Sequence, residues 1–419
     1  MNRRRSIAVV GAGVAGLTAA YVLSRSYDVV LHEAEERLGG HAHTHRLPTR
    51  EGGTVQVDTG FIVHNERTYP YLLRLFRELD VPTQDAEMSM SVRCDGCGLE
   101  YAGARGARGL LGGGNAGRPR LLRMLADVPR FHRAARRLLA ADDSTCTFGA
   151  FLRRHGFSPY FVQHFALPLV AAVWSCSPGT ALQYPAAYLF RFLDHHGLLA
   201  VTGSPQWKTV TGGSAVYVGR VAQQIAAIRT GAGVRTVVRG PEHVRVVTAE
   251  GRSTEHRAVV IAVHPDQALR LLADPTPLEK DVLGSFLYSS NPTVLHRDTS
   301  VLPRGAHARA SWNYRLPSCE ARPGSVQVSY DMNRLQRLGS AEPHIVTLNP
   351  DDRLDDSSVL ARMRYEHPIY TPESVAAQQL LPGLTTSVTA FAGAYHGWGF
   401  HEDGCRSGVE AARRLGVRW

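Results

Sequence analysis

The feature that most constrains this chain is a set of glycines between a strand-like and a helix-like segment near its start. Residues 6–10 form an apolar run of strand length, and Gly11, Gly13 and Gly16 follow in the pattern G-x-G-x-x-G. A helix-like segment and a second apolar strand then lead to Glu33. In such a unit the first glycine allows a tight turn, the second lets the backbone approach a pyrophosphate, and the third lets helix and strand pack closely. The motif therefore predicts a dinucleotide site, with the phosphates at the helix N-terminus and ribose hydroxyls on Glu33.

The composition is that of a soluble globular enzyme long enough for two or three domains. Of the 419 residues, 44% are hydrophobic and 20% are charged. No apolar run reaches the roughly 18 residues needed to span a membrane. All but two of the 47 basic residues are arginine, the exceptions being Lys208 and Lys280, so the net charge of +10 reflects a general preference for arginine. Because no nucleic-acid-binding motif accompanies this charge, we expect no nucleic-acid partner.

The arginines at residues 3–5, followed by an alanine-rich apolar stretch, are also typical of a secretory signal. A signal peptide needs neither glycines at this spacing nor a second strand that ends on an acid. We therefore expect a cytoplasmic protein, and the six scattered cysteines fit a reducing compartment.

Two groups of residues raise the question of a metal site. Cys94 and Cys97 form a single C-x-x-C, which is half a zinc site or a redox pair. Neither a second C-x-x-C nor a histidine pair at finger spacing accompanies it, so we interpret residues 94–97 as a polar hairpin turn. The histidines at 41, 43 and 45 alternate along an extended segment without carboxylates, which is poor ligand geometry. We expect no metal ligands in this chain.

Three further segments carry a resemblance to a known family. Residues 33–44 match E-x(3)-R-x-G-G-x-x-x-T, residues 55–65 form an alternating strand that runs into a glycine, and residues 391–404 read FAGAYHGWGFHEDG before a predicted helix over 405–415. These motifs resemble the flavin-containing amine oxidase superfamily, which also includes phytoene desaturases and flavin-dependent fatty-acid isomerases. The spacing of residues 173–214 is similar to a bacterial subgroup of predicted NAD/FAD-binding proteins that are often encoded beside cyclopropane-fatty-acyl-phospholipid synthases.

The resemblance implies an α/β fold, α+β overall, in which a Rossmann-type FAD-binding domain is interleaved with a substrate domain of mixed sheet plus helices. The expected FAD-binding segments are residues 1–68, 206–265 and 386–419, and the expected substrate-domain segments are residues 69–205 and 266–385. Within them the sequence pattern predicts helices over 69–80, from about 100 to 205 and over 215–228, a β-meander over 231–265 whose last strand re-enters the Rossmann sheet, and strands over 281–345.

The resemblance also implies where FAD lies. In the superfamily Gly40 and the following residue, usually arginine but here His41, lie by the pyrophosphate and flavin. The segment 59–62 passes beneath the isoalloxazine ring, and the residue that matches Val234 packs by the adenine. The start of the last helix directs N–H groups and a positive dipole at flavin N1 and O2. The expected cofactor-binding residues are Gly11, Gly13, Val14, Ala15, Gly16, Glu33, Ala34, Arg37, Gly39, Gly40, His41, Thr59, Gly60, Phe61, Ile62, Val234, Gly393, Ala394, His401 and Glu402. Covalent attachment through Cys405 or a histidine near residue 41 is disfavoured, so we expect non-covalent FAD.

The residues that face the substrate are less well defined by the sequence. Amine oxidases usually carry a lysine that is hydrogen-bonded through water to flavin N5, and the resemblance places it within residues 286–296. Neither lysine of this chain falls there, which counts against amine oxidation. The best candidates for the wall that faces the substrate are His396, Trp398 and Phe400, of which Phe400 fits the aromatic cage of the family. Lower-ranked catalytic candidates are His64, Trp312 and Tyr314.

These patterns favour an FAD-dependent oxidoreductase that removes or relocates hydride on an unsaturated or modified fatty-acyl chain, as a desaturase, dehydrogenase or double-bond isomerase. The alternatives are an amine oxidase that releases peroxide and a non-catalytic FAD-bearing partner of a lipid methyltransferase. The arginine-rich amphipathic segment 118–140 is either a peripheral contact with the inner face of the membrane or a solvated arginine face.

Overall fold

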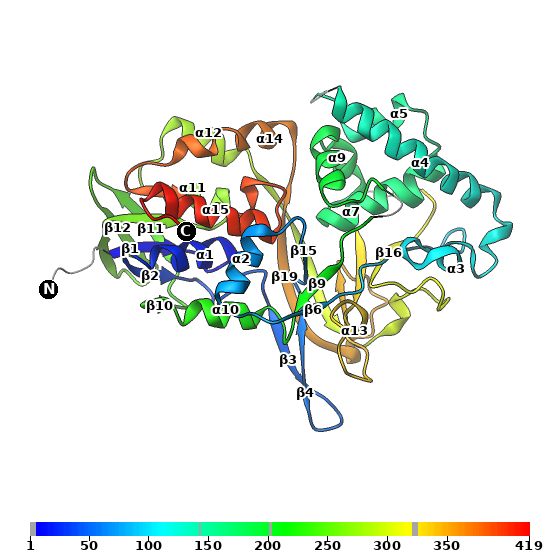
Figure 1. The fold of residues 1–419 in the computed structure, drawn as a ribbon, viewed down its shortest axis with the longest axis horizontal. Helices are drawn as coiled ribbons and strands as arrows, with labels where there is room; N and C mark the ends of the chain where they lie inside the picture. Colours follow the sequence, from blue (N-terminus) through cyan, green and yellow to red (C-terminus); the bar gives the residue numbers. More distant parts are fainter. Residues whose placement is uncertain (1–5, 142, 144, 201–202, 321–325) are drawn as a thin grey trace.

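Five parallel strands form the central sheet of one lobe, on the left in Figure 1, which we call the parallel-sheet lobe. The computed structural model describes residues 6–141, 143, 145–200, 203–320 and 326–419, so the arginines at 3–5 lie outside the described residues. The strand order is β10-β2-β1-β14-β20. The strands are β1 (Ser6–Val10), β2 (Asp28–His32), β10 (Ala227–Arg229), β14 (Ala258–Ile261) and β20 (Thr389–Phe391). Three well-separated parts of the chain therefore contribute to one sheet.

Alternate residues of β1 face the two sides of this sheet. Ile7 and Val9 pack on the side of α1 (Val14–Leu23), α2 (Pro70–Glu78), α10 (Ala215–Ala222) and α15 (His401–Arg414). Ala8 and Val10 pack on the opposite side, which is covered by a small sheet and three helices. These elements are β11 (Val234–Arg239), β12 (Val244–Thr248), β13 (Ser253–His256), α11 (Pro265–Leu271), α12 (Pro277–Gly284) and α14 (Pro372–Gln378). Both faces are thus buried, as a parallel sheet requires.

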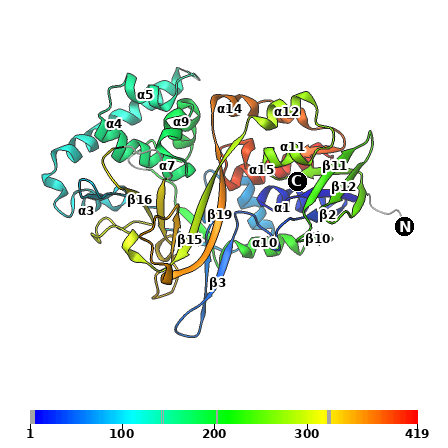
Figure 2. The same ribbon diagram turned by 180° about the vertical axis from the view of Figure 1, so that it is seen from behind.

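A seven-stranded sheet with the order β19-β15-β18-β17-β16-β7-β8 belongs to the other lobe, which we call the mixed-sheet lobe. All of its pairs are antiparallel except β7 with β16. Its strands are β7 (Met90–Cys94), β8 (Leu99–Ala102), β15 (Leu287–His296), β16 (Trp312–Leu316), β17 (Gln327–Asp331), β18 (Ile345–Leu348) and β19 (Val359–Ile369). β15 and β19 pair along the whole of β15 and run between the two lobes in both views (Figures 1 and 2).

Helices between residues 106 and 195 complete the mixed-sheet lobe. They are α3 (Gly106–Leu111), α4 (Pro119–Ala140), α5 (Phe148–Arg154), α6 (Pro159–Phe161), α7 (Leu167–Trp174), α8 (Pro178–Gln183) and α9 (Ala186–His195), with a π-helical turn, η3 (Val162–Ala166), and the short α13 (Met332–Leu335) farther along the chain. Phe131 lies at the centre of this group, with six phenylalanine rings around it. Smaller sheets near the junction of the lobes contain β3 (Thr44–Pro48), β4 (Thr54–Asp58), β5 (Val63–Asn65), β6 (Thr83–Asp85) and β9 (Trp207–Val210).

α4 is the amphipathic helix predicted over residues 118–140. Leu121, Met124 and Phe131 are buried, whereas the arginines at 120, 123, 130, 133, 136 and 137 are exposed. No helix among the described residues is long and apolar enough to cross a membrane.

The mixed α/β architecture confirms the predicted fold class, and two expected helices have different ends. The helix predicted over 215–228 ends at Ala222, because residues 227–229 extend as β10 and pair with Val30–His32 of β2. The helix predicted over 405–415 begins earlier, at His401, where Asp403 accepts a hydrogen bond from the Phe400 N–H and so caps the first turn. The meander over 231–265 is confirmed, and its last strand, β14, re-enters the parallel sheet between β1 and β20.

Candidate cofactor and substrate site

In the glycine loop after β1, two of the three glycines lie too close to other backbone atoms to carry a side chain, and the third does not. Gly11 has φ +97°, and a Cβ there would lie 2.6 Å from the Ala262 carbonyl oxygen. A Cβ on Gly16 would lie 1.9 Å from the Gly11 carbonyl oxygen. A Cβ on Gly13, in contrast, would meet no atom within 4 Å. The loop therefore leaves open space at Gly13, beside the N-terminus of α1, which no side chain caps and which carries no acidic residue in its first turn.

The second glycine motif lies directly against the first. The Gly39 N–H donates to the Ala12 carbonyl oxygen at 2.9 Å, and a Cβ on Gly40 would lie 3.2 Å from the Gly13 Cα. Both glycines have positive φ, +111° and +56°, which glycine adopts without strain. Arg37 fixes this turn, because its guanidinium donates to the Gly40 carbonyl oxygen at 2.7 Å. Residues 37–40 are thus brought to the edge of the space beside Gly13.

Glu33 and Val234 lie at the other side of the loop. Glu33 Oε2 accepts a hydrogen bond from the Ala12 N–H at 2.7 Å, so the carboxylate supports the glycine loop itself. The neighbouring Ala34 lies 3.3 Å from the position of a Cβ on Gly233, which places Val234 at the start of β11 next to the end of β2. The roles predicted for Glu33 and Val234 in binding the adenosine half of a dinucleotide stay predictions.

Helix α15 begins at the same end of the lobe as α1 and packs closely against it through glycines. A Cβ on Gly404 would lie 2.6 Å from Val14 Cγ1, and a Cβ on Gly408 would lie 2.4 Å from the Ala15 carbonyl oxygen. Because the two helices run parallel in this contact, both of their N-termini lie beside the glycine loop. Thr18 donates to the Cys405 thiol at 3.5 Å, so that cysteine is part of the helix contact.

The acidic residues in the first turn of α15 have partners within the protein. Glu402 accepts from the Tyr71 and Leu72 N–H groups, both at 3.0 Å, and thereby caps the N-terminus of α2. Burial raises the pKa of Glu402 to about 7. Asp403 pairs with Arg406 at 3.1 Å, and burial raises the pKa of Asp403 to about 6. The role predicted for Glu402 in cofactor binding stays a prediction, and its observed contacts are with α2.

His41 follows the glycine pair and faces the strand that joins the lobes. Its ring lies 5.1 Å from the Tyr365 ring and 5.6 Å from the His367 ring, both on β19. His367 in turn lies 3.0 Å from Asn291 Nδ2 on β15. Burial, helped by neighbouring charges, lowers the pKa of His41 to about 3 and that of His367 to about 4. Both imidazoles are therefore neutral at physiological pH, and His41 Nε2 is buried without a partner among the described residues.

The stretch of β15 that the resemblance assigns to the lysine contains no lysine. Ser289, Ser290 and Asn291 stand there instead, and Asn291 accepts from Asn349 Nδ2 at 2.8 Å. Lys208, which lies on β9, pairs with Glu66 at 3.0 Å. In this part of β15, the Asn291 amide lies beside the neutral imidazole of His367.

The segment 59–62 contacts both the backbone that follows the second glycine turn and several aromatic side chains. The Thr59 hydroxyl lies 2.7 Å from the Tyr365 hydroxyl, and a Cβ on Gly60 would lie 2.2 Å from the His41 carbonyl oxygen. Phe61 stacks on His401 with 3.6 Å between ring centroids. The His401 ring also lies 3.0 Å from the Tyr217 hydroxyl, and burial lowers the pKa of His401 well below its ordinary value. Ile62 is buried and its carbonyl oxygen accepts from Thr209.

Trp398 and Phe400 lie where the C-terminal segment meets the helices of the mixed-sheet lobe. Phe400 stacks on Phe192 of α9 at 4.7 Å, and the Trp398 ring lies 5.8 Å from the same phenylalanine. The Trp174 indole N–H donates to the Trp398 carbonyl oxygen at 3.1 Å. Three side chains donate to the carbonyl oxygen of Gly397, between His396 and Trp398, and they are Tyr188, Tyr370 and Gln378. The C-terminal motif is thereby joined to an aromatic wall built from α7, α9 and β19.

The other catalytic candidates lie apart from this wall. His64 is fully buried on β5 with neither ring nitrogen paired, and burial lowers its pKa to about 4. His396 lies beside Tyr395, with 4.7 Å between ring centroids, and its Nε2 is unpaired. Tyr314 is buried on β16, where burial raises its pKa, and Trp312 packs on Tyr330 on the same sheet. The structure does not bring Tyr314 or Trp312 into contact with His396.

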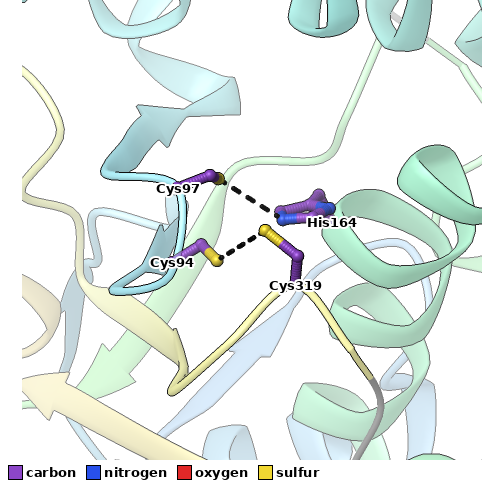
Figure 3. Close-up of side chains that lie close together, drawn as sticks. All are labelled: Cys94, Cys97, His164 and Cys319. Atoms are coloured by element: carbon purple, nitrogen blue, oxygen red, sulfur yellow. Dashed lines mark hydrogen bonds between the residues drawn. The ribbon is translucent and has the colours of Figure 1, made fainter.

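Two groups of residues in the structure were not found from the sequence. Asp58 is buried and accepts hydrogen bonds from Thr44, Ser214 and Gln336, which ties β3, β4, α10 and the segment after α13 together. Burial raises the pKa of Asp58 to about 6. The second group contains Cys94 and Cys97, which do form the predicted hairpin turn but lie next to two residues far away in the sequence, Cys319 and His164 (Figure 3). The predicted hairpin turn is confirmed, and its neighbours could not be found from the sequence because no local spacing links residues 94, 164 and 319.

The residues around the glycine loop fit FAD. Space at Gly13 is open where a pyrophosphate approaches, and the uncapped N-terminus of α1 supplies N–H groups for it. Unpaired buried nitrogens, among them His41 Nε2, lie farther along the site. Gly11, Gly13, Val14–Gly16 and Gly39–His41 would hold the pyrophosphate side, and the start of α15 would face the flavin ring. Bound FAD supplies a hydride acceptor, which none of the side chains described above provides.

Comparison with known proteins agrees with this geometry. Residues 14–293 match the family model described as flavin containing amine oxidoreductase. A putative flavin-containing monoamine oxidase, AofH, of Mycobacterium tuberculosis H37Rv is 29% identical over 282 residues, which are 64% of this chain and 59% of that protein. The flavin-dependent L-tryptophan oxidase RebO of Lentzea aerocolonigenes is 50% identical over 52 residues, 12% of this chain and 11% of RebO. The chain thus spans about three fifths of the length of the first of these relatives.

Solved structures of the same fold carry different activities in their titles. Cyclohexylamine oxidase from Brevibacterium oxydans IH-35A has a TM-score of 0.69 at 15% identity, with 98% of each chain covered. A CLA-producing fatty acid isomerase from P. acnes has a TM-score of 0.71 at 16% identity, with 100% of each chain covered. At these identities the likeness concerns the fold alone.

Proposed function

Since the chain belongs to the family of flavin-containing amine oxidoreductases and is an FAD-dependent oxidoreductase, we propose that its substrate is an unsaturated or modified fatty-acyl chain rather than an amine. The reaction is the removal of hydride from a carbon of that chain or its relocation along it. In a dehydrogenation the lipid loses a hydride and a proton and gains a carbon–carbon double bond. In an isomerisation the double bond moves and the lipid keeps its composition.

The observation that carries the proposal is the set of uncharged side chains that His41 meets on β15 and β19. The stretch 286–296, where the resemblance implies a lysine, contains none, and its Asn291 contacts the neutral imidazole of His367. His41, whose ring lies 5.6 Å from the His367 ring, is also neutral at physiological pH. An uncharged region of this kind suits a hydrocarbon chain, whereas an ammonium group is costly to bury without a partner.

The carboxylates near this region are already used by other groups. Glu402 caps α2, and Asp403 pairs with Arg406. These two carboxylates are therefore not free to pair with a cationic substrate. The aromatic wall of Trp398, Phe400 and Phe192 offers apolar surface instead.

Two buried histidines add polar atoms to the site without adding charge. His41 Nε2 and His396 Nε2 have no partner among the described residues, and burial lowers the pKa of His41 to about 3 and that of His396 to about 4. Stacking of Phe400 on Phe192 adds apolar surface to the wall.

The test is an anaerobic titration of the FAD-loaded protein with unsaturated or cyclopropane-containing lipids and, separately, with a panel of polyamines and aromatic amines. Loss of the visible flavin absorbance with a lipid and no change with amines is the expected result for a dehydrogenase. For an isomerase the absorbance returns, and analysis of the acyl chains detects a moved double bond. Absence of any spectral or chemical response to lipids would contradict the proposal.

Amine oxidation is the second candidate, and the family match together with the Phe400 wall favours it. The carboxylate pairing described above counts against it. Peroxide release from any amine of the panel under air would favour amine oxidation over the lipid reaction.

A further inference from the structure

We propose that the full-length protein binds one zinc ion between Cys94, Cys97, Cys319 and His164, at a site in the mixed-sheet lobe that is separate from the flavin site. One nitrogen and three sulfur atoms of these residues all lie within 4.8 Å of one another. They come from three segments far apart in the sequence, and Figure 3 shows their side chains directed at a common point. This proposal does not depend on the identity of the substrate.

The distances match tetrahedral zinc coordination. Cys94 Sγ and Cys319 Sγ are 3.7 Å apart, and Cys97 Sγ is 3.8 Å from His164 Nε2. With Zn–S distances of about 2.3 Å and a tetrahedral angle, two thiolate sulfurs around one ion lie about 3.8 Å apart. A disulfide would require the sulfurs at about 2.0 Å, so these thiols are free, and their spacing is compatible with ligands around one ion.

The turn that carries the first two cysteines has the geometry of a metal-binding turn. Cys94 ends β7, Cys97 lies in the turn before β8, and Gly98 has φ +66°, which glycine accommodates. A C-x-x-C turn of this spacing supplies two of the four ligands in many structural zinc sites.

Backbone contacts hold the turn against the segment that carries Cys319. The Asp95 N–H donates to the Leu316 carbonyl oxygen at 2.8 Å. A Cβ on Gly96 would lie 3.1 Å from the Cys319 N, so the two segments touch at backbone distance. The Asp95 carboxylate is paired with Arg315 at 2.7 Å and is therefore not needed as a ligand.

His164 is oriented for coordination through Nε2. It lies in the π-helical turn η3, an irregularity that often marks functional positions. Its Nδ1 lies 3.0 Å from the Tyr160 carbonyl oxygen, which can only accept, so Nδ1 carries the proton and Nε2 carries the lone pair. The Tyr101 hydroxyl donates to the His164 carbonyl oxygen at 2.6 Å and fixes this turn against β8.

A set of three thiolates and one neutral imidazole favours zinc over harder cations, which prefer oxygen ligands. Binding releases the three thiol protons and leaves four protein ligands around the ion, as in a structural site. The ion would join the β7–β8 hairpin, the turn before α7 and the segment after β16. Its role is therefore to fasten the helices of the mixed-sheet lobe to the mixed sheet.

The first test is the metal content of the full-length protein purified under reducing conditions without chelator. About one zinc per chain is expected, with X-ray absorption giving three sulfur ligands and one nitrogen ligand at the distances of tetrahedral zinc. Cys97→Ser and His164→Ala should each lower the zinc content at least tenfold. Cys146→Ser is the matched control, because that buried thiol lies outside the cluster, and it should retain zinc.

A second measurement covers the case in which a variant fails to fold. Addition of cobalt(II) to the reduced, chelator-treated wild-type protein should produce the absorption bands of tetrahedral thiolate-bound cobalt, and Cys319→Ser should weaken the thiolate band. Chelation should lower the melting temperature while FAD stays bound, and added zinc should restore it. Wild-type protein that contains no zinc and gives no cobalt bands, that contains iron instead, or that carries a Cys94–Cys319 disulfide in peptide mass analysis would overturn the proposal.

Discussion

The two lobes differ in the kind of contact that stabilises each of them internally. In the parallel-sheet lobe, α1 and α15 touch through Gly404 and Gly408, and the glycine loop leaves no room for a Cβ at Gly16. In the mixed-sheet lobe, Phe131 contacts six phenylalanine rings, and the C-terminal motif is received by tyrosines and a tryptophan. The first lobe depends on the backbone approaching closely, and the second depends on large side chains filling space. The lobe that binds a nucleotide is therefore intolerant of added atoms, whereas the other is intolerant of lost ones.

The largest expected effect comes from adding atoms to the parallel-sheet lobe. Gly16→Val places a Cβ 1.9 Å from the Gly11 carbonyl oxygen, and neither backbone segment can move freely. We expect a loss of about 4 kcal/mol or more in the free energy of unfolding and a protein purified without flavin. Urea unfolding and the ratio of flavin to protein absorbance measure both. Near-normal stability with bound flavin would show that the close contact is not essential.

Removal of atoms from the mixed-sheet lobe is expected to have the next largest effect. Phe131→Ala leaves a cavity among six rings and should lower the free energy of unfolding by about 3–5 kcal/mol. The folded fraction should still bind FAD, because Phe131 belongs to the other lobe. Phe131→Leu, which retains most of the volume, is the control and should cost less. A loss of FAD affinity in the folded variant would contradict the separation of the lobes.

The pH dependence of stability tests the contact between α15 and α2. Burial raises the pKa of Glu402 to about 7, above its unfolded value, so its favourable contribution is complete at low pH and is lost as the pH rises through 7. From pH 5 to pH 8, the free energy of unfolding of the apoprotein should fall by on the order of 2 kcal/mol more than that of the Glu402→Gln variant. Chemical unfolding of both proteins across this range gives the difference. A difference that is flat or that grows with pH would show that Glu402 is stabilised as a carboxylate.

A gentler change to the glycine loop separates cofactor binding from folding. Gly13 has φ −69° and open space around the position of a Cβ, so Gly13→Ala should leave apoprotein stability unchanged or raise it by less than about 1 kcal/mol. The added methyl group would occupy the approach of the pyrophosphate and weaken FAD binding about tenfold, or about 1.4 kcal/mol. Fluorescence titration of the apoprotein with FAD measures this affinity. Unchanged affinity would place the phosphates elsewhere.

The smallest effect concerns the exposed arginines of α4. If this face contacts anionic lipid, Arg120→Ala and Arg123→Ala should each weaken binding to anionic vesicles by about 1 kcal/mol. Arg245→Ala, an exposed arginine on β12, is the matched control. Vesicle sedimentation at low and moderate salt gives the result. Equal binding of all three variants would identify the arginines of α4 as a solvated face.

The difference between the lobes also explains which features were predictable from the sequence. The glycines at 11–16 and at 39–40 act through the backbone over short segments, so their spacing alone indicates the turn and the helix that follow. β1, β2 and α1 lie where this spacing predicts. The absence of the lysine is also evident from the sequence, because the resemblance along the whole chain assigns that lysine to residues 286–296.

Features assembled from distant side chains were not predictable in this way. Cys94, His164 and Cys319 meet only because β7 pairs in parallel with β16 and because η3 packs against the same hairpin. Likewise, Glu402 looked like a first-turn residue available to a cofactor, but the packing of α15 on α2 gives it two backbone partners. Periodicity and motif spacing contain no information about such long-range pairing.

The measurement that tests the central claim most directly is product analysis by mass spectrometry after the FAD-loaded protein has been incubated with a phospholipid that carries unsaturated acyl chains. We expect acyl chains that have lost two hydrogens or whose double bond has moved, with no peroxide released from amines. Unchanged acyl chains, together with peroxide released from an amine, would contradict it.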